Sequence, residues 1–71
     1  MRKGSELYNS PFAADLKAWA RRMGYTRAEA AEALGDVPIS TYDGWCVGRP
    51  PALEGTLRRL MAALEAEATR P

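Results

Sequence analysis

Glycine and proline residues divide this short chain into segments that are each only long enough for one helix. Gly24, Gly35 and Gly48 interrupt the sequence, and Pro50 and Pro51 follow closely after the last of them. Glycine favours the left-handed conformation that ends a helix, and two consecutive prolines cannot continue one. No segment between these breaks alternates apolar and polar residues as a half-buried strand does. The sequence therefore predicts an all-α protein in which four helices form one compact domain.

Each predicted helix has its own start signal or apolar stripe. The expected helices cover residues 11–23, 27–34, about 38–47 and 53–67. Ser10 and Pro11 supply a cap and a first-turn proline, and Thr26 with Glu29 forms a capping box before the second helix. The third helix begins near Pro38, a proline that only a first turn tolerates. At helical spacing, the residues expected to face inward are Phe12, Leu16, Trp19, Met23, Tyr42, Trp45, Leu53, Leu57, Leu60, Met61 and Leu64.

Length and composition exclude several classes of protein. The 71 residues form one domain at most, with residues 1–10 expected as a flexible arm and residues 11–68 as the folded part. Because the chain has no histidine and Cys46 is its single cysteine, we expect no metal site and no Cys–His nucleophile. We expect a cytoplasmic protein without a secretory signal or a membrane span. Glu29 and Glu32 are one turn apart but typical of surface charge, so we expect no enzyme, no cofactor and no small-molecule ligand.

The charge pattern is compatible with nucleic-acid binding without requiring it. The formal net charge is only +1, which argues against a protein that binds nucleic acid by overall basicity. Arginine outnumbers lysine. An excess of arginine suits contacts to phosphate or guanine, but it is equally typical of a protein encoded by a GC-rich genome.

The stretch from Leu16 to Leu64 resembles the helix-turn-helix family of Cro and the phage repressors, also called the XRE family. The motifs that carry the resemblance, in order, are Leu16 and Trp19, the run from Gly24 to Gly35, Ser40-Thr41-Tyr42, Trp45, and Gly48-Arg49-Pro50-Pro51. The resemblance implies a lambda-repressor-like domain with a central helix-turn-helix, in which residues 38–47 form the recognition helix. This sequence departs from the family pattern through an extra Asp36 in the turn, Pro38 in place of the usual cap, and Gly44 in mid-helix.

The resemblance also assigns roles to individual residues. Those placed at base edges are Ile39, Ser40, Thr41, Asp43 and Gly44. Those placed near DNA phosphates are Arg27, Arg49, Arg21, Arg22 and Tyr42, the last from a partly buried position. For Asp43, two other roles stay open, a charge favoured by the helix dipole or a capping pair with Ser40.

The function that the resemblance implies is transcriptional regulation. We expect a sequence-specific protein that binds double-stranded DNA, a repressor of phage or plasmid origin that recognises an inverted repeat as a homodimer. The alternative is a small protein-interaction module, such as an antitoxin or anti-activator, that retains the fold. Near-neutral charge favours the alternative, as does the lack of Arg, Lys, Asn and Gln between Pro38 and Val47.

Overall fold

The computed structural model describes residues 10–69, which form four helices. They are α2 (Pro11–Met23), α3 (Arg27–Ala33), α4 (Ile39–Cys46) and α5 (Glu54–Ala68). These described residues contain no strand, which confirms the predicted all-α class. The arm predicted over residues 1–10 lies outside the described residues except for Ser10.

Local capping signals set the ends of α2 and the start of α3, as the sequence predicts. The Ser10 hydroxyl accepts a hydrogen bond from the amide of Phe12 at 3.1 Å. Gly24 ends α2 in the left-handed conformation, with a φ of 74°. Thr26 and Glu29 form the capping box, because each side chain accepts a hydrogen bond from the other residue's amide, at 2.8 and 3.1 Å.

The turn between α3 and α4 absorbs the extra residue by two successive left-handed conformations. Gly35 has a φ of 108° and Asp36 a φ of 58°. Aspartate is one of the few residues other than glycine that adopts this region readily. The prediction that α4 starts in the first turn at Pro38 is wrong by one residue. Pro38 has a ψ of 146°, which is extended backbone, so it precedes the helix and Ile39 is the first helical residue.

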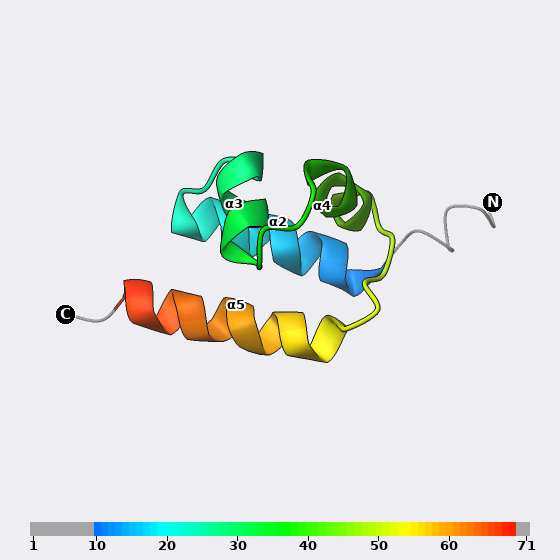
Figure 1. Ribbon diagram of the computed structural model, residues 1–71. Coiled ribbons are helices and arrows are strands. Elements are labelled where there is room, and N and C mark those ends of the chain that lie inside the picture. Colours follow the sequence, from blue (N-terminus) through cyan, green and yellow to red (C-terminus); the bar gives the residue numbers. More distant parts are fainter. Residues whose placement is uncertain (1–9, 70–71) are drawn as a thin grey trace.

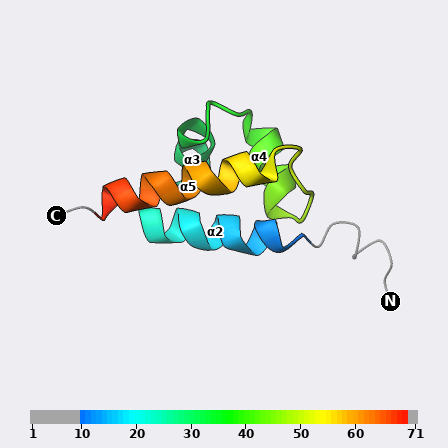
Figure 2. The same cartoon turned by 90° about the horizontal axis from the view of Figure 1, so that it is seen from below.

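The longer helices α2 and α5 run side by side in the same direction (Figures 1 and 2). In Figure 1, α3 and α4 lie above α2, and α5 runs below it. α4 packs against both α2 and α3, and α5 packs against α2.

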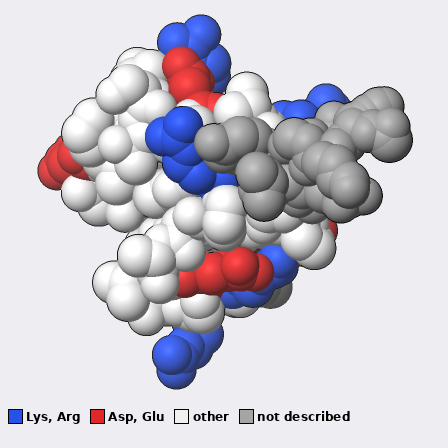
Figure 3. Space-filling view, turned by 90° about the vertical axis from the view of Figure 1, so that its right-hand side faces the viewer, with Lys and Arg blue, Asp and Glu red and all other residues white. Residues whose placement is uncertain are grey.

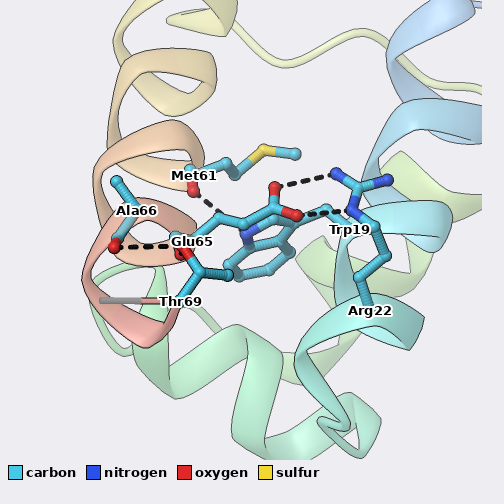
Figure 4. A network of polar contacts seen from close by, with 6 residues as sticks. All are labelled: Trp19, Arg22, Met61, Glu65, Ala66 and Thr69. Atoms are coloured by element: carbon cyan, nitrogen blue, oxygen red, sulfur yellow. Dashed lines mark hydrogen bonds and ion pairs between the residues drawn. The ribbon is translucent and has the colours of Figure 1, made fainter. Parts of the chain in front are cut away.

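The core forms around three side chains of α2 that are almost completely buried: Phe12, Leu16 and Trp19. The Trp19 indole nitrogen donates a hydrogen bond of 3.0 Å to the carbonyl oxygen of Met61, which joins α2 to α5 (Figure 4). The Tyr25 ring meets the Trp19 ring edge to face, with 5.5 Å between centroids. The other buried apolar residues of the cluster are Ala20, Ala30, Ala31, Leu34, Tyr42 and Met61.

One residue of the predicted apolar stripe of α5 lies outside the core. Leu53 is 67% exposed, so its assignment to the core was wrong. It precedes the helix with a φ of −116° and a ψ of 56°, and this non-helical backbone removes its side chain from the stripe. Leu57, Leu60 and Leu64 are half-buried and pack against the core cluster as expected.

Arg58 adds polar contacts between α2 and α5. Its guanidinium pairs with Asp15 at 2.7 Å and with Glu54 at 2.8 Å, and it lies 5.3 Å from the centre of the Phe12 ring. Exposed ion pairs contribute only about 0–1 kcal/mol each. Burial of the apolar side chains therefore supplies most of the stability that holds the two helices together.

Among the aromatic residues, Trp19 should cause the largest loss of folding stability when its side chain is shortened. Trp19→Phe removes the donor to the Met61 carbonyl and part of a fully buried ring, so we expect the free energy of unfolding to fall by about 2 kcal/mol. Trp45→Phe is the matched control, because the Trp45 indole is half-buried and donates no hydrogen bond among the described residues. Urea unfolding measures both changes. Equal losses in the two variants would contradict the assignment of Trp19 as the central contact.

Candidate nucleic-acid interface

α4 has one side in the core and one side open to solvent. Tyr42 is 2% exposed, and the Trp45 ring meets the Phe12 ring edge to face at 6.2 Å. On the other side, Ser40 and Thr41 are exposed and Ile39 is 38% exposed. Three of the five residues expected to read bases are thus exposed on one packed helix. Asp43 and Gly44, the other two, are half-buried.

Asp43 has a partner that the sequence did not predict. The guanidinium of Arg27, the first residue of α3, lies 3.2 Å from the carboxylate of Asp43. The Arg27 side chain is 67% exposed and the Asp43 side chain 43% exposed, so the pair is well solvated and contributes little to stability. Its consequence is local neutralisation, because Arg27 offsets the one carboxylate on α4. The alternative of a capping pair between Ser40 and Asp43 is wrong, because α4 has no side-chain cap.

A second group of cations lies where α2, α3 and α4 meet. Arg21 lines a hollow of about 420 Å³ together with Lys17 and Arg27. Tyr42, Asp43 and Cys46 form its α4 wall. Lys17 was not among the phosphate contacts predicted from the sequence, although Lys17 and Arg21 are four residues apart and therefore share one face of α2.

Arg22 lies in a different place from the other predicted phosphate contacts. Its guanidinium forms two hydrogen bonds with the Glu65 carboxylate of α5, at 2.6 and 2.9 Å (Figure 4). This charged hydrogen bond raises the pKa of Arg22 and lowers the pKa of Glu65. Arg22 therefore links α2 to α5, whereas Arg21 lies at the α4 side.

Arg49 follows α4 and remains close to it. The backbone amide of Arg49 donates to the carbonyl oxygen of Gly44 at 3.0 Å. Its side chain is exposed and lies beside Gly44. Arg27 of α3 and Arg49 of the loop after α4 thus each place a guanidinium group beside α4.

Tyr42 is the predicted phosphate contact that is least accessible. Burial raises its pKa to about 12, and a hydrogen bond to the Cys46 thiol contributes in the same direction. Burial also raises the pKa of the Cys46 thiol, which the hydrogen bond from Tyr42 partly offsets. The phenol is therefore a neutral group inside the fold, near the Cys46 thiol.

Charged groups of both signs are distributed over the surface. On the face that Figure 3 presents, basic and acidic side chains are interspersed among uncharged ones, and the visible described atoms form no continuous basic patch. Among residues 10–69 no group of three or more His, Cys, Asp or Glu side chains is placed to hold a metal ion. None of the described helices is long and apolar enough to cross a bilayer.

Comparison of the chain with protein-family models, curated proteins and solved structures finds no match. The resemblance to the phage-repressor type of helix-turn-helix therefore rests on the sequence motifs, and family membership stays a prediction. The four helices and their packing are observations that do not depend on it.

The raised pKa of Tyr42 predicts a stability change at alkaline pH. Because the folded protein holds this proton more tightly, the contribution is fully present below pH 10 and is lost as the pH rises from 10 to about 12. We expect the free energy of unfolding to fall over this window, and to fall less in Tyr42→Phe. Denaturant unfolding at a series of pH values measures it.

The control uses a Cys46→Ala background for both proteins, so that thiol ionisation does not contribute. Burial is the largest cause of the Tyr42 shift and persists without the sulfur atom. Parallel pH profiles with and without the phenol would refute the assignment.

Proposed function

We propose that this protein binds double-stranded DNA through the open side of α4 and acts as a transcriptional regulator. The observation that carries the proposal is the position of α4. It packs on α2 and α3 while Ser40 and Thr41 are exposed and Ile39, at its first turn, is 38% exposed. A helix fits the major groove of B-DNA, which is about 12 Å wide, and its exposed N-terminal residues can then reach base edges.

The cations around α4 support the same proposal. Arg27 and Arg49 lie on the segments next to α4, and Lys17 with Arg21 lies behind Arg27. Such groups can neutralise phosphates on either side of the groove and position the helix without reading sequence. The first turn of α4 has no side-chain cap, so its amide groups are available to water or to phosphate oxygen.

A homodimer on an inverted repeat belongs to the proposal for a geometric reason. One recognition helix reads only a few base pairs, and a two-fold pair doubles them with half-sites about 34 Å apart. Most of the α5 leucines pack against the core of their own chain, so Leu53, at 67% exposure, is the large apolar side chain of this region most open to a second subunit. Repression, and an origin in a phage or plasmid, are further parts of this proposal that follow from the family resemblance alone.

A protein-interaction module is the second candidate, and one observation favours it. Val47, which follows α4, is 70% exposed, and Ile39 at the other end of the helix is 38% exposed. Exposed apolar residues on a helix can anchor a partner protein as well as they can meet thymine methyl groups. The near-neutral net charge of +1 is compatible with either partner.

Arg27 provides the test of DNA binding. We expect Arg27→Ala to weaken binding to every duplex sequence alike, and to lower the slope of log K against log salt by about 1, because one phosphate contact is lost. Fluorescence anisotropy with labelled duplexes at several salt concentrations measures both quantities. Arg59→Ala, an exposed residue of α5, is the matched control and should change neither.

The partner of Arg27 sharpens this test. Asp43→Asn removes the carboxylate that faces the guanidinium, so it should strengthen DNA binding several-fold through reduced repulsion of phosphates. If the wild-type protein shows no salt-dependent binding to any duplex at low salt, DNA binding is refuted. Binding of a protein partner that Ile39→Ser and Val47→Ser abolish, but Arg27→Ala does not, would then support the second candidate.

A further inference from the structure

The open side of α4 lacks the side chains that most often read bases in the major groove. Bidentate contacts to guanine come from Arg or Lys, and those to adenine come from Asn or Gln. None of these residue types occurs between Pro38 and Val47. A protein that reads bases through this helix needs a discriminating group from another part of the chain.

Gly44 of α4 has no side chain, and the side chain of Arg49 lies beside it. A Cβ atom at Gly44 would lie 3.7 Å from Nη1 of Arg49, 3.8 Å from its Cδ and 4.0 Å from its Cζ. Gly44 has no positive φ, so the backbone does not require a glycine there. Glycine in mid-helix also lowers helix propensity. An added methyl group would be in ordinary van der Waals contact with the guanidinium, whereas a longer side chain would occupy its place.

The chain after α4 holds Arg49 at this place through three backbone hydrogen bonds. The Arg49 amide donates to Gly44 at 3.0 Å, and the Gly48 amide donates to Trp45 at 3.1 Å. The Gly48 carbonyl oxygen accepts from the Ser10 amide at 3.2 Å, which ties the loop to the start of α2. Gly48 makes the reversal possible with a φ of 114°. The base of the Arg49 side chain is thus fixed against the last turn of α4.

We propose that Arg49 is the residue that reads a guanine base in the major groove, from its position beside Gly44. This inference rests on the proposed function. A guanidinium group presents two parallel donors that match the O6 and N7 acceptors of guanine. Because the Arg49 side chain lies over Gly44, its donors are on the Gly44 side of α4. Ser40, one turn before Gly44, is on the same side of the helix.

This role is distinguishable from the phosphate contact that the family resemblance implies for Arg49. A phosphate contact weakens binding to all sequences equally when it is lost, and it changes the salt dependence. A guanine contact changes the preference at one base pair of the site and leaves the other positions alone. Arg49→Ala separates the two because it removes every donor of the side chain, and the loss then falls either on one base pair or on all sequences alike.

The experiment selects binding sites for the full-length chain from a pool of duplexes with a randomised central segment. We expect the wild-type protein to enrich a motif with an invariant G·C pair. In Arg49→Ala, discrimination for guanine at that one position should fall by about 5- to 150-fold, the usual value of a bidentate base contact. Arg59→Ala, on exposed α5, is the matched control and should retain the complete motif.

Substitutions at Gly44 test the same contact without altering Arg49. A Cβ atom at 3.7 Å is in ordinary van der Waals contact, so Gly44→Ala leaves room for the guanidinium and should raise the melting temperature. Gly44→Leu places further carbon atoms where the guanidinium lies, so it should reproduce the loss of guanine preference. Circular dichroism confirms that both variants remain helical.

Each outcome decides between the proposals. Loss of one guanine preference in both Arg49→Ala and Gly44→Leu supports base reading by Arg49. An unchanged motif in Arg49→Ala, with weaker binding to all sequences alike, overturns it and leaves Arg49 as a phosphate contact. Binding of duplex DNA without any enriched motif overturns base reading while DNA binding itself stands. Absence of all duplex binding refutes the proposed function, and this inference with it.

Discussion

Burial of the Trp19 side chain is the contact on which the arrangement of the other helices depends. The indole lies in the cluster that contains Ala30, Ala31 and Leu34, and its nitrogen donates to the Met61 carbonyl of α5. It therefore joins the core residues around α3 to α5 through one side chain of α2. The small residues Ala30 and Ala31 of α3 lie in the same cluster, and α3 packs against α4. A chain of this size has few other ways to fix three helices around a fourth.

The signals that predicted the fold are local ones. Capping residues, glycine ends and apolar spacing act within a few residues of themselves, so the sequence located α2 correctly and the other helices to within about one residue. The two errors have a common origin. Pro38 and Leu53 each precede a helix, where the backbone departs from helical angles while the sequence pattern continues. A pattern of residue types cannot indicate at which of two adjacent residues that change occurs.

The candidate interface was less predictable because its contacts join distant parts of the chain. Ile39, Ser40 and Thr41, which the family resemblance places at base edges, are exposed. The pairing of Arg27 with Asp43, and of Arg22 with Glu65, depends on how whole helices pack, and no spacing rule gives it. The position of Arg49 beside Gly44 is of the same kind. There, the side chain of Arg49 from the next loop lies beside a glycine that is unfavourable in a helix.

The central claim is that the open side of α4 is the DNA-binding surface. The most direct measurement is the change in backbone amide NMR shifts when a random-sequence duplex is added to the labelled protein at low salt. The account predicts that shifts concentrate at Ile39 to Gly44, at Arg27 and at Arg49, and that the exposed residues of α5 such as Arg59 do not move. Shifts centred on α5, or none with excess duplex, would contradict it.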